Sequence, residues 1–176
     1  MVSSPAVSPL NLSNQLISAN ETPTQSQSQK PNAIKKEKTS FPVTRVIDGD
    51  TIVVNMNGEQ VHVRLIGINS PEPNDKRAQV ACFAKKAKDE PEKLLDGKNV
   101  YLEKDSTQGD YDKYGRLLAY TFTENGIFFN KLMIEEGYAY EYTYRLPYKY
   151  QAEFKAAQQE ARDNKEGLWG NNVCEW

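Results

Sequence analysis

The 176-residue chain changes character at Phe41. Residues 1–40 are rich in Ser, Gln, Asn, Pro and Thr, and they end with the charged run KKEK at residues 35–38. Such a segment buries too little apolar surface to offset the entropy cost of ordering it. From Phe41 onward, apolar and polar positions follow regular periods. The pattern therefore predicts a disordered leader or linker over residues 1–40 and one folded domain over residues 41–176.

Short β-branched and alternating stretches predict five strands in this domain. The first three cover residues 43–47, 51–55 and 60–67. Asp-Gly and Asn-Gly pairs separate them, and such pairs are typical of tight hairpin turns. Two further strand-like stretches cover residues 99–103 and 116–123. Val, Ile, Thr, Tyr and Phe recur in these stretches, as expected of strands.

Three stretches predict helices. Residues 78–89 are rich in Ala and Lys, and we expect this helix to stop at Pro91, because proline disrupts a helix interior. Asn130 is expected to be the N-cap of a short second helix, and Pro147 suits the first turn of a third. The third helix has an apolar face with spacings of four, three and four, formed by Tyr150, Phe154, Ala157 and Ala161.

This order of elements favours a mainly β, α+β fold. Five short strands with a helix between the third and fourth form the sequence of elements in an OB-fold, a small Greek-key barrel. Ferredoxin-like and SH3-like arrangements fit less well. With about three helices, we expect a five-stranded OB-fold barrel. Such a fold does not by itself establish a function.

Composition and charge restrict the functional classes. The formal net charge is −2, and residues 1–40 carry four Lys and two Glu, so residues 41–176 carry −4. Proteins that coat nucleic acid are usually basic, so phosphate handling here requires a localised site or a metal. No apolar run reaches the length of a membrane span. The single histidine, His62, argues against a zinc site and is interpreted as a surface residue.

Polar residues gather at the predicted strand ends. They are Asp48, Asp50, Arg64, Asn69, Ser70, Glu72, Asp112 and Arg116. Carboxylate, amide and carbonyl oxygens are ligands of hard cations such as Ca²⁺. Arginines bind phosphate oxygens and stabilise charge that develops in a transition state. A nearby carboxylate can orient or deprotonate a water molecule. The set therefore predicts a metal-assisted phosphodiester site.

Four blocks carry a resemblance to a known family. They are VIDGDTI (residues 46–52), VRLIGINSPE (63–72), DKYGRLLAY (112–120) and KEGLW (165–169). In order and spacing they resemble the staphylococcal (micrococcal) nuclease family, the thermonucleases. The resemblance implies an OB-fold and a Ca²⁺-dependent phosphodiesterase acting on DNA and RNA. It also implies cleavage of the bond to the 5′ oxygen, which leaves 3′-phosphate products.

The resemblance also implies a calcium site. Asp50 and Asn69 would be side-chain ligands, and Ser70 would contribute its backbone carbonyl. Asp48 either contributes to the electrostatic field around these ligands or only caps its turn. The family usually has Asp at the position of Asn69. An amide oxygen can still bind a metal but brings no charge, so we expect retained activity that needs more calcium.

Further roles carried over from the family concern the substrate. Glu72 would position or activate the attacking water, although an acid after proline is also typical of a helix start. Arg64 and Arg116 would grip the phosphate, with Arg116 also helping the leaving oxygen. Tyr142 and Tyr144 fall near the family's nucleotide-pocket tyrosines, with a spacing that differs by a residue. Single-stranded substrates and a monomeric protein are expected.

The two cysteines, Cys82 and Cys174, are compatible with buried thiols or with one disulfide. The resemblance to exported nucleases implies a Cys82–Cys174 disulfide and an oxidising compartment. We therefore expect an extracytoplasmic protein whose targeting signal has been removed.

Two alternatives to a nuclease remain at this stage. One is a catalytically weakened nucleic-acid-binding module of the same family, and Asn69 is the feature that favours it. The other is a calcium-stabilised interaction protein, in which Arg64 and Arg116 would have no purpose. Asp112 is interpreted as a turn residue that orders the loop before Arg116.

Overall fold

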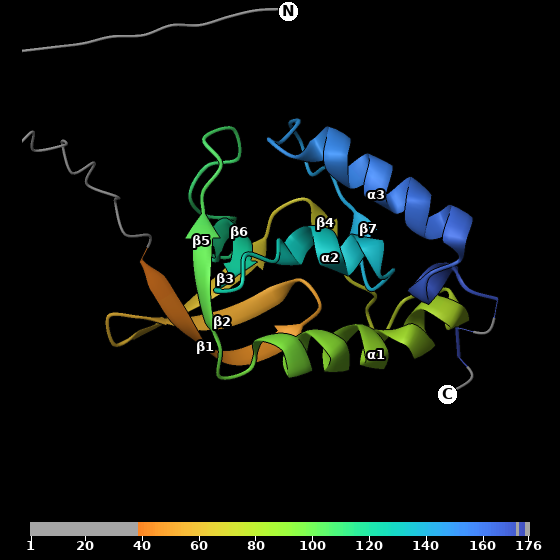
Figure 1. Cartoon of the computed structure of the whole chain (residues 1–176), viewed down its shortest axis with the longest axis horizontal. Helices are drawn as coiled ribbons and strands as arrows, with labels where there is room; N and C mark the ends of the chain where they lie inside the picture. The colour runs from red at the N-terminus through yellow and green to blue at the C-terminus, as the bar shows by residue number, and fades with distance from the viewer. Residues whose placement is uncertain (1–38, 172, 175–176) are drawn as a thin grey trace, which may run out of the picture. The chain divides into compact units, whose positions relative to one another are not determined.

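The computed structural model describes residues 39–171, 173 and 174, and its strands form a closed barrel in the order β1-β2-β3-β6-β5 (Figure 1). These strands are β1 (Ser40–Asp48), β2 (Thr51–Met56), β3 (Glu59–Leu65), β5 (Asn99–Glu103) and β6 (Leu117–Thr123). The expected five-stranded, mainly β barrel is confirmed. Of the predicted leader over residues 1–40, the first 38 residues lie outside the described residues.

The strand pairing brings distant segments to one end of the barrel. β3 and β6 are parallel, and all other barrel pairs are antiparallel. Thr51 at the start of β2 pairs with Arg64 near the end of β3. Val63 pairs with Leu117, the first residue of β6. The turn between β1 and β2, the end of β3 and the start of β6 therefore meet.

The first helix is longer than the sequence predicts. α1 (Ala78–Leu95) runs through Pro91, so the expected stop at this residue is wrong. Proline removes the hydrogen bond to the Ala87 carbonyl, but Pro91, Ala87 and Leu95 are all buried. Packing of this buried face offsets the lost bond, because most helical stability in proteins comes from tertiary packing.

Asn130 has a different role from the expected cap. It is the second residue of α2 (Phe129–Glu135) and is fully buried. Its side-chain oxygen accepts a hydrogen bond from the Thr121 amide (2.9 Å), and its side-chain nitrogen donates to the Ile66 carbonyl (2.9 Å). A buried backbone group without a hydrogen-bond partner is costly. Asn130 therefore provides partners for one backbone amide and one backbone carbonyl of the barrel region, and it connects α2 to them.

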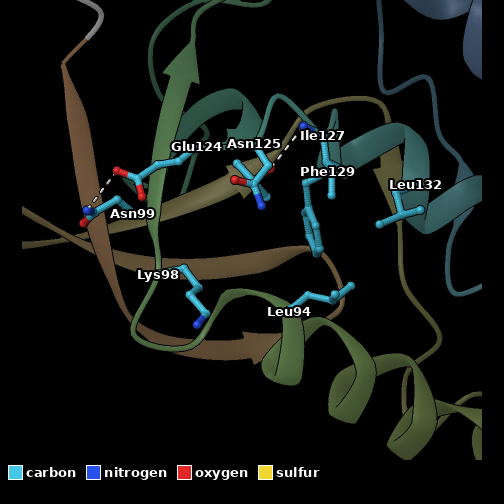
Figure 2. A pocket seen from close by; sticks show the side chains of 9 residues that line it. Leu94, Lys98, Asn99, Glu124, Asn125, Ile127, Phe129 and Leu132 are labelled. Atoms are coloured by element: carbon cyan, nitrogen blue, oxygen red, sulfur yellow. Dashed lines mark hydrogen bonds between the residues drawn. The ribbon is translucent and has the colours of Figure 1, made fainter.

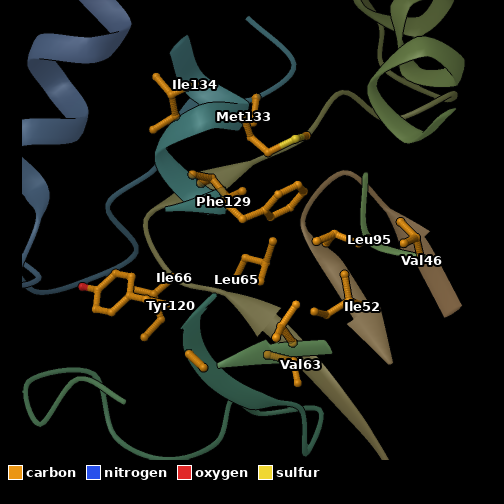
Figure 3. Close-up of a cluster of buried hydrophobic side chains, with 14 of the residues drawn as sticks. Val46, Ile52, Val63, Leu65, Ile66, Leu95, Tyr120, Phe129, Met133 and Ile134 are labelled. Atoms are coloured by element: carbon orange, nitrogen blue, oxygen red, sulfur yellow. The ribbon is translucent and has the colours of Figure 1, made fainter. Parts of the chain in front are cut away.

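The hydrophobic core lies between the barrel and the helices. Phe129 and Met133 point from α2 toward the barrel, where Leu65 and Ile52 are also buried (Figure 3). The third helix, α3 (Gln151–Asn164), packs on α2. Its predicted apolar face is confirmed, since three members are buried and one is partly buried, namely Phe154, Ala157 and Ala161 with Tyr150. Pro147 precedes this helix rather than starting it.

Two short strands were not predicted from the sequence. β4 (Ile68–Asn69) and β7 (Tyr140–Glu141) form a small antiparallel sheet in which Asn69 pairs with Tyr140. Each strand has only two residues, which is too short for a period to show. A 3-10 turn, η1 (Gly167–Trp169), follows α3, and Trp169 lies against the ring of Tyr140 at 5.4 Å.

The two cysteines lie opposite one another. The Cα atoms of Cys82 in α1 and Cys174 near the C-terminus are 5.7 Å apart. This separation suits a disulfide, so the predicted pairing requires no backbone movement. Within the described residues, no helix is both long and apolar enough to cross a membrane.

Candidate active site

Asp50 is the centre of the polar cluster at the end of the barrel. Its side chain is buried, and both of its oxygens accept hydrogen bonds. Oδ1 accepts from Thr51 Oγ1 (3.0 Å) and forms an ion pair with Arg64 Nε (3.1 Å). Oδ2 accepts from the Ser70 amide (2.8 Å) and from Ser70 Oγ (3.3 Å). The turn between β1 and β2 is therefore fastened to the segment that follows β4.

The Arg64 guanidinium spans the two predicted side-chain ligands of the metal. Besides its ion pair with Asp50, Arg64 donates from Nη2 to Asn69 Oδ1 (3.2 Å) and from Nη1 to the Leu65 carbonyl (2.6 Å). The Asn69 side-chain nitrogen lies 3.4 Å from the Ser70 carbonyl oxygen. Arg64 thus supplies the positive charge between these oxygens, and a cation at this place would share them with the guanidinium.

Arg116 is held at the same end of the barrel by Asp112 and Thr51. Its Nε contacts Asp112 Oδ2 at 2.7 Å, and its Nη1 donates to Thr51 Oγ1 at 3.2 Å. Asp112 Oδ1 also accepts from the backbone amides of Tyr114 and Arg116 (both 2.9 Å), so Asp112 orders the turn as expected. Since Thr51 bonds to both Asp50 and Arg116, it links them, a role that the sequence did not reveal.

Negative charge is concentrated around Asp48. Its Oδ1 accepts from the Asp50 amide (2.9 Å), as in a turn cap. Burial raises the pKa of Asp48 to about 6, and the charges of Asp50 and then Glu72 contribute in the same direction. Glu72 itself is exposed. The site therefore holds three carboxyl groups close enough to interact, although Arg64 pairs with only one of them.

The donor set fits a hard cation. Among the described residues, no three Asp, Glu, His or Cys side chains are grouped so as to hold a metal on their own. An ion here would need the Asn69 amide oxygen and the Ser70 carbonyl oxygen in addition to Asp50. All of these are oxygen donors of the kind that Ca²⁺ accepts. The mixture contains fewer charges than an all-carboxylate site, so weaker binding is expected of it.

Three exposed tyrosines lie on the loops before β6 and after β7, and we call Tyr114, Tyr142 and Tyr144 the tyrosine wall. Their exposed fractions are 71%, 42% and 58%. The rings of Tyr142 and Tyr144 are 6.4 Å apart, and the guanidinium of Arg116 lies 5.5 Å from the Tyr114 ring. The guanidinium of Arg145 lies 5.2 Å from the Tyr144 ring. Exposed rings beside cationic groups suit stacking of nucleobases.

Tyr114 was missed by the sequence analysis, although the motif DKYGRLLAY contains it. Its neighbour Lys113 connects the two parts of the wall. A hydrogen bond with Tyr114 raises the pKa of Lys113, and the nearby Tyr144 hydroxyl adds to this effect. The loop before β6 and the loop after β7 therefore lie close together on one side of the site.

A separate hollow of about 320 Å³ lies at the far end of β6, where the strand ends at Thr123 (Figure 2). Its lining is partly apolar, and Asn99 donates to Glu124 (3.1 Å) across its rim. The remaining lining residues are Leu94, Lys98, Asn125, Ile127, Phe129 and Leu132. None of the predicted site residues lines this hollow, so it does not form part of the cluster around Asp50.

Comparison with known proteins decides the family. The family model described as "Staphylococcal nuclease homologue" matches residues 62–171, more than half of the chain. The chain belongs to this family. The match starts after Asp50, but the contacts of Asp50 with Arg64 and Ser70 join it to the matched region.

The similarity to named relatives covers about three quarters of this staphylococcal nuclease homologue. It is 38% identical to a thermonuclease of Staphylococcus hyicus over 132 residues, which cover 75% of this chain and 76% of the relative. It is 37% identical to a thermonuclease of Staphylococcus intermedius, with coverages of 74% and 76%. It is 33% identical to the endonuclease YncB of Bacillus subtilis (strain 168), with coverages of 78% and 65%.

Proposed function

We propose that this staphylococcal nuclease homologue is a Ca²⁺-dependent nuclease that hydrolyses DNA and RNA. Cleavage breaks the bond to the 5′ oxygen and leaves a 3′-phosphate. The observation that carries the proposal is the continuous chain of contacts from Arg116 through Thr51 and Asp50 to Arg64. These side chains come from three segments of the sequence and meet at one end of the barrel. The names of the relatives support the same class of activity.

In this proposal, Asp50, Asn69 and the Ser70 carbonyl hold the calcium ion. When bound, the ion supplies positive charge beside the phosphate and balances the surplus of carboxylates in the site. Asp50 is fixed by Thr51 and Ser70 before any ligand arrives. A metal ligand that is already oriented does not have to be ordered when the ion binds, so little binding free energy is lost.

Glu72 acts as the general base of the proposed reaction. It is exposed at the rim of the site, where it takes a proton from the attacking water. Arg64 and Arg116 donate hydrogen bonds to the phosphate oxygens as negative charge increases in the transition state. Arg116 is held by Asp112 on one side and Thr51 on the other, so its orientation is determined before the substrate binds.

The exposure of the tyrosine wall supports a single-stranded substrate. Bases can stack on Tyr114, Tyr142 and Tyr144 only when they are free of their neighbours in a duplex, which favours single-stranded DNA or RNA. Because stacking does not depend on base identity, little sequence preference is expected. The protein acts as a monomer in this proposal.

The cysteines support an extracytoplasmic location. A Cys82–Cys174 disulfide would close a loop with a sequence separation of 92 residues. In the chain-entropy account, closing a loop of this size stabilises the folded state by about 4–5 kcal/mol. Disulfides persist in oxidising compartments, and residues 1–40 would then serve as a linker. Equal free-thiol counts in the denatured protein with and without reductant would remove the disulfide from the proposal.

One assay tests the activity. Denatured DNA is incubated with the full chain in CaCl₂ or in EDTA, next to the variants Glu72→Ala and Glu160→Ala. Glu160 is exposed on α3 and serves as a matched control. We expect calcium-dependent cleavage that is lost in Glu72→Ala and kept in Glu160→Ala. Binding of DNA without cleavage would instead support the weakened binding module, which the neutral Asn69 favours.

A further inference from the structure

Asp105 is a buried carboxylate outside the proposed calcium site, and only 5% of it is exposed. Its Oδ1 accepts from the amide (2.9 Å) and the hydroxyl (2.8 Å) of Thr107. Its Oδ2 accepts from the Tyr120 hydroxyl (2.6 Å) and from the Lys149 amide (2.8 Å). Tyr120 is fully buried in β6. Asp105 therefore attaches the segment around Lys149 to the wall of the barrel.

Neighbouring residues continue this attachment. Thr107 Oγ1, whose single hydrogen is donated to Asp105, lies 3.2 Å from the Pro147 carbonyl oxygen. Gln108 Nε2 donates to the carbonyls of Leu146 (3.3 Å) and Pro147 (3.2 Å). We call Asp105, Thr107 and Gln108 the Asp105 clamp. The clamp contacts the carbonyl oxygens of Leu146 and Pro147 and the amide of Lys149, just before α3.

The two segments that the clamp joins carry the two parts of the tyrosine wall. The loop between β5 and β6 starts beside Asp105 and contains Tyr114. The segment held by the clamp follows Tyr142 and Tyr144 in the sequence. Its other end is fixed by the backbone bond from the Tyr142 amide to the Gly67 carbonyl (2.9 Å). The tyrosines thus lie on a short segment that is fastened at both ends.

We propose that Asp105 is a positioning residue that sets the placement of Tyr142 and Tyr144 relative to Tyr114, and thereby governs binding of a single nucleic-acid strand. The inference rests on the proposed nuclease function. Asp105 itself contacts no substrate, because its oxygens are buried and engaged by four protein donors. Its effect passes through the segment that it holds.

The carboxylate is required because every group facing it is a donor. An amide in its place would turn its NH₂ group toward either Thr107 or the Tyr120–Lys149 pair, and a donor would then face donors. Burial raises the pKa of Asp105, but the hydrogen bonds from Lys149, Tyr120 and Thr107 outweigh it, so the pKa lies below its ordinary value. The group is ionised at neutral pH and accepts all four bonds.

The test compares Asp105→Asn with Ile134→Val, a buried substitution in α2 that leaves the clamp intact. Binding is measured in the full chain carrying Glu72→Gln, which prevents cleavage, with a fluorescent oligothymidylate in CaCl₂. Cleavage rates are measured with Glu72 intact. We expect Asp105→Asn to raise Kd and KM about fivefold and kcat to change less than about twofold, a split that locates the effect in binding. Ile134→Val should leave Kd, KM and kcat unchanged.

A double-mutant cycle separates positioning from a general structural effect. If Asp105 acts through the wall, Asp105→Asn adds no further loss of binding once Tyr142→Ala and Tyr144→Ala are present. Additive losses, or a Kd equal to that of Ile134→Val, would overturn the inference. If Asp105→Asn does not fold, Thr107→Val takes its place. This substitution removes the hydroxyl of this exposed residue, which donates to Asp105. The same rise in Kd and KM is expected.

The proposed nuclease activity and the role of Asp105 can be refuted separately. If the protein with Glu72 intact neither cleaves nor binds the oligonucleotide, the proposed function is wrong and the clamp proposal falls with it. If it cleaves in calcium but the cycle is additive, only the role of Asp105 is wrong.

Discussion

The buried cluster around Asp50 and the tyrosine wall differ in how their side chains are held. Asp50, Thr51 and Ser70 are 4%, 3% and 1% exposed, and hydrogen bonds fix their side chains. Tyr142 and Tyr144 are 42% and 58% exposed. Groups that stabilise developing charge act best when they are oriented beforehand, whereas rings that receive a flexible strand must be open. In the proposed function, this contrast corresponds to a division between residues for the chemical step and residues for substrate binding.

The same substitution in each region provides the sharpest contrast. Arg116→Lys removes the fork held between Asp112 and Thr51, and lysine cannot reproduce its paired donors. We expect kcat for denatured DNA to fall about 100-fold for this variant. Arg145→Lys, over the exposed Tyr144 ring, should change kcat less than about threefold. Equal losses in initial-rate measurements would abolish the distinction between the two regions.

Asn69→Asp tests the proposed calcium site beside Asp50. A carboxylate adds a charge to the donor set, and ligand charge is a main determinant of calcium affinity, so we expect binding about tenfold tighter. Competition from Arg64, which already contacts Asn69, limits the gain. Calorimetric titration with CaCl₂ in the absence of substrate measures it. The control Asn125→Asp lies at the distant hollow and should not change the affinity.

Tyr142→Ala and Tyr144→Ala probe the wall. Each removes one stacking surface, and we expect KM to rise about fivefold while kcat stays within twofold. Leu94→Ala, an exposed apolar substitution at the distant hollow, serves as the control. A fall in kcat with unchanged KM would show that these rings take part in the chemical step.

Asp48→Asn should have the smallest effect, a change in the free energy of unfolding. The sign of this change follows from the raised pKa of Asp48. The folded-state pKa of about 6 lies above the ordinary pKa of 3.8 for an aspartate, so the folded protein binds the proton more tightly than the unfolded chain. The ionised carboxylate therefore destabilises the folded state above pH 6, and this penalty disappears below pH 4. Asparagine keeps the acceptor for the Asp50 amide.

In EDTA at pH 7, we expect Asp48→Asn to be more stable by about 1 kcal/mol, a rise of about 3 °C in melting temperature. The difference should vanish at pH 4. The same variant should bind calcium more weakly, because it removes negative charge from the site. A lower melting temperature at pH 7 would mean that the Asp48 carboxylate stabilises the metal-free protein.

Much of the fold was predictable because its signals are local. β-Branched and alternating stretches identified all five barrel strands, and the apolar face of α3 followed from its spacing. The errors occurred where tertiary contacts outweigh local preference. Pro91 is retained within α1 because its face is buried, and Asn130 serves the Thr121 and Ile66 backbone groups instead of a helix end.

The sequence by itself determined the barrel, the family resemblance and the residue types of the site, because motif letters and periods are properties of the chain. Only the tertiary structure decided which groups touch. Thr51 joins Asp50 to Arg116, and Asp105 reaches Lys149 across 44 positions. Such contacts depend on the closure of the barrel, which brings segments together whose separation in sequence carries no periodic or compositional signal.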